Sequence, residues 1–403
     1  MASQKKSTKK IIAPGYQFAG IHCGIKDKKK KDLALMVSEV PAKVVACFTT
    51  NRVQAAPIHQ GKDVIRNGRL QALVVNSGNA NAITGKRGLN NSYRIAAVVA
   101  KSLGLSEKDV LVSSTGKIGA QLPMPGILKG IPKAVEKLSP EGLKQTAQAI
   151  LTTDAFPKVC QRKGKIRGKS YTLTGVAKGA GMIEPHMATM LAYVFTDLDL
   201  PRPLMQRVFS QTVDETFNSI SVDGDQSTND TALLMANGVS GIRLASPSAP
   251  EFRTFQKQLQ EVCETLAWMM VQDGEGATKV VEIRVKGAKN KGSARKIAYS
   301  IARSQLVKTS FFGEDPNWGR VFAAIGYSGE TLNPSKVDID YGPVPLVRRG
   351  LPTSLAQEAK AHRLMKKGHF SVKVNLNSGR GEARVFTSDL TYEYVKINAE
   401  YRT

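Results

Sequence analysis

The chain has 403 residues, enough for one large domain or two ordinary ones. Apolar residues make up 41% and charged residues 23%, which is typical of a globular protein. No stretch approaches the roughly 18 consecutive apolar residues of a membrane helix. The lysine-rich start also lacks the apolar middle of a signal peptide. We therefore expect a cytoplasmic protein with no membrane partner.

The net charge of +25 is unevenly placed: residues 1–31 contribute +8, and the other +17 is spread over the remaining 372 residues. Residues 1–31 hold nine lysines against one acidic residue, Asp27. We interpret this segment as a basic, mobile start, because it has little apolar content. A basic nucleic-acid-binding protein without catalysis remains an alternative. The aromatic share of 6%, however, offers no evident platform for base stacking, and nucleic acid is not our preferred partner.

In chain order, apolar runs and amphipathic periodicity predict both strands and helices. In the first part of the chain the predicted strands are residues 33–50, 70–75, 110–112 and 170–177, and the predicted helices are residues 92–103 and 140–152. In the second part the predicted helices are residues 207–217, 251–270 and 294–306. The predicted strands there are residues 280–285, followed by a pair, 370–376 and 382–386, around the turn at 377–381. This mixture predicts an α/β or α+β fold.

Several familiar kinds of site are missing from the sequence. It contains no G-x-S-x-G elbow, no H-E-x-x-H helix and no Walker loop. The four cysteines form no C-x-x-C pair, which argues against a disulfide framework or a zinc site. Residues 223–230 are rich in oxygen ligands but lack the spacing of a calcium loop. We interpret them as a polar turn that supports an active site, and we expect no metal and no cofactor.

The segment from Lys178 to Leu191 carries the most informative chemistry. A lysine and two glycines precede Ala188-Thr189 and an apolar strand. A threonine hydroxyl becomes a useful nucleophile when an adjacent N-terminal amine takes its proton. Such an amine has a pKa of about 8, close to neutral pH. This chemistry requires the chain to split between Ala188 and Thr189. The alternative is a glycine turn that leads into a buried strand.

This segment resembles the autoprocessing motif of the ornithine acetyltransferase family, also called the bifunctional glutamate N-acetyltransferase and amino-acid acetyltransferase. Further stretches resemble the family in the same order along the chain: residues 48–51, 76–82, 84–85, 114–116, 152–154, 221–225, 315–320 and 397–401. The resemblance therefore covers almost the whole chain. The chain departs from the pattern at His186, where the family usually has asparagine, and near Ile83, where it usually has cysteine or a small residue.

The resemblance implies an α/β fold of layered sheets and helices, similar to N-terminal-nucleophile enzymes. It implies self-cleavage into an α chain, residues 1–188, and a β chain, residues 189–403, assembled as an α2β2 heterotetramer. Thr189 is then the nucleophile, and the Thr115 hydroxyl and the Gly116 N–H form the oxyanion hole. The remaining substrate-binding residues by resemblance are Thr152, Lys178, Glu275, Asn398 and Thr403.

The implied reaction moves the acetyl group of N2-acetylornithine to glutamate, in arginine biosynthesis. It runs as a ping-pong cycle through an acetyl-threonine ester. An N-terminal-nucleophile amidohydrolase or aminopeptidase, which passes the acyl group to water, is the alternative enzyme. Acetyl-CoA as a second donor, feedback by arginine, the effect of His186 and the purpose of the basic start are not decided by these motifs.

Overall fold

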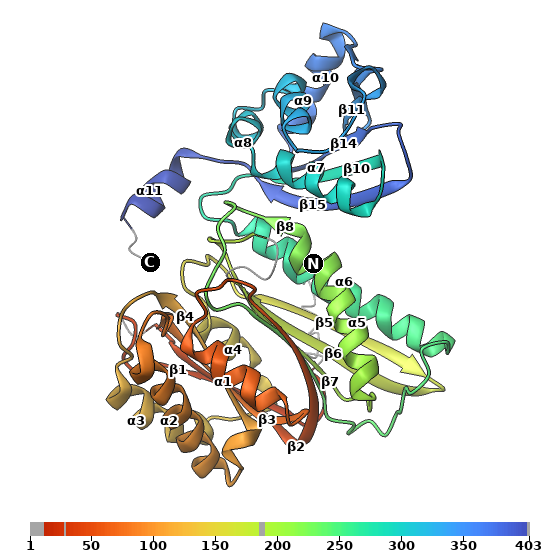
Figure 1. Ribbon diagram of the computed structural model, residues 1–403. Helices are drawn as coiled ribbons and strands as arrows, with labels where there is room; N and C mark the ends of the chain where they lie inside the picture. The colour runs from red at the N-terminus through yellow and green to blue at the C-terminus, as the bar shows by residue number, and fades with distance from the viewer. Residues whose placement is uncertain (1–11, 28–29, 185–189, 401–403) are drawn as a thin grey trace, which may run out of the picture.

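The computed structural model of the protein describes residues 12–27, 30–184 and 190–400. Within these ranges the strands form two sheets with helices packed on them, as Figure 1 shows. The first sheet lies in the lower part of that view, and the second sheet lies in the upper part. This layered arrangement of sheets and helices confirms the predicted α/β class.

The first sheet has the strand order β4-β3-β2-β9-β7-β6-β5, with β1 paired to β2. Its strands are β1 (Tyr16–Ile21), β2 (Leu33–Phe48), β3 (Arg69–Asn79), β4 (Val110–Lys117), β5 (Lys158–Ile166), β6 (Lys169–Lys178), β7 (Leu191–Thr196) and β9 (Thr231–Ala236). The long strand β2 changes register between Val37 and Ala42, around Pro41, which has no N–H to donate. This irregularity lets one strand serve β1 at one end and β9 at the other.

Helices cover the first sheet in two groups. They are α1 (Ala56–Ile65), α2 (Gly85–Leu103), α3 (Met124–Glu136), α4 (Leu143–Ala149), α5 (Arg202–Glu215) and α6 (Pro250–Gln272). In one core, Phe209 of α5 and Leu259 of α6 are fully buried with Val194 of β7. In another, Ile95 and Ile127 from α2 and α3 pack with strands β1 to β4. Each such side chain contributes about 1.5–3 kcal/mol through burial.

The second sheet has the strand order β13-β12-β11-β14-β10-β15-β8. Its strands are β8 (Ile220–Ser221), β10 (Val280–Ala288), β11 (Asp338–Tyr341), β12 (Val344–Arg348), β13 (Leu351–Pro352), β14 (His369–Asn375) and β15 (Gly381–Ser388). Its helices are α7 (Lys291–Arg303), α8 (Gln305–Phe312), α9 (Trp318–Gly326) and α10 (Leu355–Met365), with α11 (Tyr392–Glu400) after the last strand. Residues of α7 to α10 share one core with the sheet.

The predicted pairing of residues 370–376 with 382–386 is wrong. Both segments are strands, β14 and β15, but β10 lies between them, parallel to β14 and antiparallel to β15. The connecting loop crosses the end of β10, where Leu376 N donates to Lys286 O and Ser378 N to Gly287 O, each at 2.9 Å. A turn-rich sequence indicates that the chain reverses direction. It does not indicate whether another strand lies between the two strands that the turn connects.

The other predicted elements agree with the structure in type and differ in their ends. The predicted strand at 33–50 is β2, and the helices at 207–217 and 251–270 overlap α5 and α6. The predicted helix at 140–152 is a 3₁₀ turn (Pro140–Gly142) followed by the short α4. The helix predicted at 294–306 divides at Ser304, whose hydroxyl accepts from Val307 N and so begins α8.

Part of the basic start is built into the fold. Strand β1 pairs with β2, and its residues Tyr16 and Phe18 are fully buried. Their rings lie 5.1 and 5.4 Å from the ring of Phe195 in β7. The prediction of a mobile start is therefore wrong for this stretch, while residues 1–11 and 28–29 lie outside the described residues. The sequence-based prediction missed strand β1, with its buried aromatic residues, because lysine-rich stretches lie on both sides of it.

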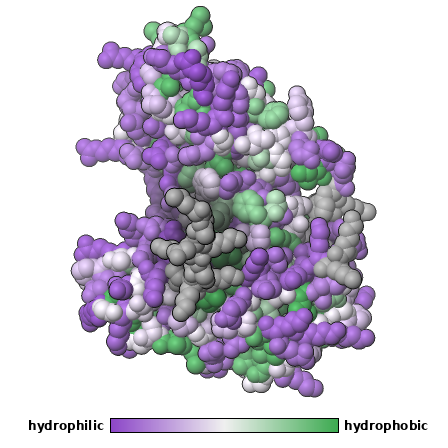
Figure 2. Space-filling view, turned by 180° about the vertical axis from the view of Figure 1, so that it is seen from behind, coloured by the Kyte–Doolittle hydropathy of each residue, from purple (hydrophilic) through white to green (hydrophobic). Residues whose placement is uncertain are grey.

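Polar side chains predominate on the face seen in Figure 2, and apolar side chains form scattered patches there. In the part of the chain that the structure describes, no helix combines the length and the apolar content needed to cross a bilayer.

Strand direction brings several strand ends to one end of the first sheet. Strands β3 and β4 are parallel, so Gly78 and Gly116 face each other at their carboxyl ends. Strand β6 ends at Lys178, whose cross-strand partner is Leu191, the first residue of β7. Leu191 in turn pairs with Thr231 at the start of β9. The polar turns at these ends therefore meet at the same place.

Candidate active site

A cavity of about 200 Å³ opens at this end of the first sheet. It is lined by six of the residues selected from the sequence, namely Thr115, Gly116, Thr152, Lys178, Glu275 and Asn398. They come from β4, the loop before β5, the end of β6, the loop after α6, and α11. The structure thus brings together residues from distant parts of the chain. Ala188, Thr189 and Thr403 lie outside the described residues.

Near the end of strand β4, Gly116 follows Thr115 and adopts a conformation that favours glycine. Gly116 has a φ of +130°, and a Cβ placed on it would lie 2.3 Å from the carbonyl carbon of Gly78. The turn is held by Asn229, whose Nδ2 donates to Ala80 O at 2.6 Å and to Ser114 O at 2.9 Å. The Gly116 N–H and the Thr115 hydroxyl are therefore held beside the cavity.

Gly116→Ala is expected to destabilise the protein through this close approach. Gly119 offers a matched control, because its φ is +83° and a Cβ there would meet nothing within 4 Å. We expect Gly116→Ala to lower the free energy of unfolding by about 1–3 kcal/mol more than Gly119→Ala, the usual cost of an overpacked site. Denaturant unfolding of both variants measures the difference. Equal losses would show that the Gly78 contact is not tight.

Lys178 supplies a buried cation at the floor of the cavity. Its side chain is 2% exposed, and Nζ donates to Thr152 Oγ1 at 2.8 Å and to Thr115 Oγ1 at 3.5 Å. The Asp154 carboxylate lies 3.6 Å away. Thr152 and Thr115 thus belong to one hydrogen-bonded group with the lysine. An ammonium ion in this setting can bind the carboxylate of a substrate.

Two buried ion pairs hold that group in place. Lys158 Nζ lies 2.8 Å from Asp154 Oδ1 and 2.5 Å from Asp273 Oδ2. Burial alone would raise the pKa of Asp154, but the ammonium groups of Lys178 and Lys158 outweigh it and hold that pKa well below its usual range. Asp154 also accepts from Gly179 N at 2.7 Å. It therefore ties the end of β6 to the Thr152 loop.

Glu275 and Asn398 also line the cavity. Asn398 Nδ2 donates to Glu275 Oε2 at 2.9 Å, and Glu275 N donates to Ala180 O at 2.9 Å. A Cβ on Gly181 would lie 2.4 Å from the Glu275 carboxyl carbon, so the glycine makes room for this side chain. The lining of the cavity therefore includes a lysine ammonium group and a glutamate carboxylate. Such a pair of charges suits an amino acid.

Lys26 was not among the residues selected from the sequence, but it supports the loop that carries Thr152. Lys26 Nζ donates to Leu151 O at 2.5 Å, directly before Thr152. The Asp32 carboxylate fixes the lysine's own loop by accepting from the backbone N–H groups of Cys23, Ile25 and Lys26. Burial lowers the pKa of Lys26 to about 8, with Asp32 opposing the effect and Lys178 adding to it. Because Lys26 lies in a lysine-rich stretch, nothing in the sequence distinguished it as a residue near the site.

Asp223 and Tyr394 also line the cavity. Asp223 accepts from Met182 N at 2.6 Å and from Ile183 N at 2.9 Å, and burial raises its pKa to about 6. The interpretation of residues 223–230 as a polar turn beside the site agrees with this placement. Burial likewise raises the pKa of the Tyr394 hydroxyl, and Asp223 adds to the effect. No motif in the sequence pointed to Tyr394.

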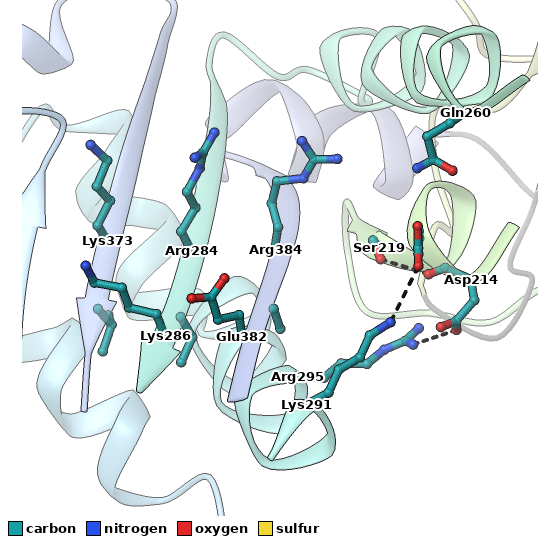
Figure 3. Close-up of a pocket in the computed structure, with 14 residues that line it drawn as sticks. Asp214, Ser219, Gln260, Arg284, Lys286, Lys291, Arg295, Lys373, Glu382 and Arg384 are labelled. Carbon is teal, nitrogen blue, oxygen red and sulfur yellow. Dashed lines mark hydrogen bonds and ion pairs between the residues drawn. The ribbon is translucent and has the colours of Figure 1, made fainter. Parts of the chain in front are cut away.

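A larger groove of about 550 Å³ lies elsewhere, between the second sheet and helices α5 to α7 (Figure 3). Its lining contains six cationic side chains: Arg284, Lys286, Lys291, Arg295, Lys373 and Arg384. Four of these have carboxylate partners, among them Arg295, which lies 2.5 Å from Asp214. The lining includes none of the described residues that were selected from the sequence. Carboxylates largely neutralise the positive charge of this groove, so the groove is not suited to binding a polyanion.

Known proteins are similar to this chain over nearly its full length. A family model described as the ArgJ family matches residues 17–403. The arginine biosynthesis bifunctional protein ArgJ of Geobacter sulfurreducens is 48% identical over 389 residues, covering 96% of this chain and 99% of that protein. The protein of the same name from Syntrophotalea carbinolica is 49% identical over 391 residues, covering 96% and 99%.

A solved structure agrees with these relatives. The crystal structure of the arginine biosynthesis bifunctional protein ArgJ from Bacillus halodurans has 42% sequence identity and a TM-score of 0.50, covering 52% of this chain and 98% of that one. The family model and the relatives extend over the same motifs that line the cavity. They confirm the family that the sequence motifs indicated, and this chain belongs to the ArgJ family.

Proposed function

We propose that this chain is an acetyltransferase of arginine biosynthesis that moves the acetyl group of N2-acetylornithine to glutamate. Relatives at 48% and 49% identity carry the name arginine biosynthesis bifunctional protein. The observation that carries the proposal is the cavity in which Thr115, Gly116, Lys178 and Glu275 meet. This cavity adjoins the start of β7, because Lys178 is the cross-strand partner of Leu191, two residues after Thr189.

The proposal includes cleavage of the chain before Thr189. The Thr189 hydroxyl attacks the Ala188 carbonyl carbon, the C–N bond breaks, and the hydroxyl proton passes to the departing amine. Water then hydrolyses the resulting ester, which leaves an Ala188 carboxylate and a free Thr189 amine and hydroxyl. That amine is the base that the same hydroxyl needs for acetyl transfer.

Acetyl transfer uses the new N-terminus twice. The Thr189 hydroxyl first attacks the acetyl carbonyl of N2-acetylornithine, releasing ornithine, and glutamate's amine then attacks the acetyl-threonine ester. Each attack forms an oxyanion, for which the Thr115 hydroxyl and Gly116 N–H are the proposed donors.

Lys178 binds a substrate carboxylate, Glu275 binds an ammonium group, and Thr152 and Asn398 position these two side chains. Thr403 completes the proposed set of substrate-binding residues.

A direct assay tests the reaction against the hydrolytic alternative. Purified protein is incubated with N2-acetylornithine, with and without glutamate, and the acetylated products are quantified. We expect N-acetylglutamate to form together with ornithine. An amidohydrolase or aminopeptidase would release acetate at the same rate in both incubations. A parallel incubation with acetyl-CoA and glutamate tests for a second donor, in line with the word bifunctional in the relatives' names.

Lys178→Met is expected to weaken substrate binding. The ammonium group is buried beside Thr152, so its loss removes a desolvated partner for the substrate carboxylate. We expect KM to rise about 10-fold to 100-fold, as for a lost buried charge pair, with a smaller change in kcat. Lys169→Met, at an exposed position of the same strand, is the control and should leave KM unchanged. A fall in kcat at constant KM would contradict the binding role.

We also propose that the two fragments remain together as an α2β2 heterotetramer. The strands β6 and β7 belong to different fragments, and β7 pairs along its whole length with residues 173–178 of β6, which favours a tight association. The expected mass in solution is twice the 43.6 kDa of one chain. Light scattering of the cleaved protein measures it, and a mass of one chain would contradict this assembly.

A further inference from the structure

Glu184 is a buried carboxylate just before the proposed cleavage segment. Its side chain is 2% exposed, and it lies four residues before Ala188 in the sequence. Ser221 Oγ donates to Glu184 Oε2 at 2.6 Å, and Arg303 Nε donates to Oε1 at 2.5 Å. Arg303 Nη2 lies against the same oxygen. The proposed reaction does not use this carboxylate, and a buried carboxylate is costly unless it is paired.

One partner of Glu184 belongs to the second sheet, and the other belongs to a helix packed on that sheet. Ser221 lies in β8, where it pairs with Thr387 of β15. Arg303 is the last residue of α7, and its guanidinium lies 5.1 Å from the centre of the Tyr299 ring. The Glu184 carboxylate therefore connects the segment that follows β6 of the first sheet to β8 of the second sheet and to helix α7.

The backbone next to Glu184 is also fixed. Asp223 accepts from the N–H groups of Met182 and Ile183, and Val222 N donates to Ile183 O at 2.8 Å. On the far side of residues 185–189, Met190 N donates to Asp230 Oδ1 at 2.8 Å. Among the described residues, Glu184 is thus the last anchored position before the proposed cleavage site, and Met190 is the first after it.

We propose that Glu184, bound by Ser221 and Arg303, is a positioning residue for chain cleavage. It fixes where the chain enters the segment that carries the Ala188–Thr189 bond. This inference rests on the proposed self-cleavage, whose net reaction is hydrolysis of that bond: water supplies OH to the Ala188 carbonyl and H to the Thr189 amine. An intramolecular attack depends steeply on geometry, and a misplacement of about 1 Å can cost roughly 100-fold in rate.

The experiment follows cleavage of full-length chain made in a cell-free translation system. Samples taken over time are separated by size, and the decay of the 403-residue chain gives the cleavage rate. The variants are Glu184→Ala, Glu184→Gln and Arg303→Met, each beside the parent. Arg295→Met is the matched control, because Arg295 also lies on α7 and near the Tyr299 ring but pairs with Asp214, as Figure 3 shows.

We expect Glu184→Ala and Arg303→Met to slow cleavage by about 10-fold to 100-fold. Glu184→Gln should be intermediate, because it keeps an acceptor for Ser221 but loses the charged contact with Arg303. The double variant Glu184→Ala/Arg303→Met should be no slower than Glu184→Ala alone, since that single variant already removes the contact with Arg303. Once cleaved, the variants should have the kcat and KM of the parent, which separates positioning for cleavage from a role in transfer.

Three results would overturn the inference. Cleavage of Glu184→Ala at the parent rate would show that the anchor is not needed. An equal slowing in Arg295→Met, or a fall in denaturation midpoint that accounts for the slowing, would show a general structural role. If the parent itself stays uncleaved while transferring acetyl groups, the proposed self-cleavage fails, and this inference fails with it for that separate reason.

Discussion

Thr189→Ala is expected to give a single 403-residue chain with no acetyl transfer, where the parent gives two fragments. The methyl side chain cannot attack the Ala188 carbonyl, so the bond stays intact. Without cleavage there is no free amine, and without the hydroxyl there is no acetyl acceptor. Chain cleavage and acetyl transfer should be lost together, because both proposed steps use the Thr189 hydroxyl oxygen. Intact mass measurement and N-terminal sequencing of the second fragment provide the test.

Two further variants make the result specific. Thr189→Ser keeps a hydroxyl and is expected to cleave, whereas Thr254→Ala, at an exposed position of α6, should behave as the parent. A parent protein that remains one chain while fully active would contradict the cleavage proposal. So would a second fragment that begins at any residue other than Thr189.

Thr115→Ala is expected to lower kcat of the cleaved enzyme by about 100-fold to 1,000-fold, which corresponds to roughly 2.7–4 kcal/mol for one oxyanion donor. The Thr115 hydroxyl is buried at the end of β4, beside the Gly116 N–H and 3.5 Å from Lys178 Nζ. The positive charge nearby strengthens a donor that faces a developing oxyanion. KM should change much less, because the interaction is made mainly in the transition state.

Thr152→Ala separates this role from substrate binding. Thr152 also holds Lys178, through a hydrogen bond of 2.8 Å, so its loss should act mainly on KM. Thr115→Ser keeps the hydroxyl and should retain most of kcat. Steady-state kinetics on cleaved protein give both constants. If Thr115→Ala raises KM while kcat holds, Thr115 is a binding residue and the oxyanion assignment is wrong.

The sequence by itself determined the family, the fold class and six of the residues that line the cavity. Motifs such as residues 178–191 are local: a lysine, two glycines and a threonine in fixed order already indicate a turn and the nucleophile proposed here. Helix periodicity is equally local, and the amphipathic pattern at 251–270 correctly indicated the helix that became α6. The resemblance then identified Asn398, more than a hundred residues from its contact Glu275.

Only the tertiary structure decided which segments lie side by side. Strand β10 fits between β14 and β15, although the turn between those two strands suggested a direct pair. Lys26 reaches Leu151, and Glu184 reaches Arg303, across 125 and 119 residues of sequence. The ion pairs of Lys158 with Asp154 and Asp273 likewise join separate elements. Such contacts depend on strand order and on the packing of whole layers, which turn chemistry and side-chain periodicity within one short segment do not specify.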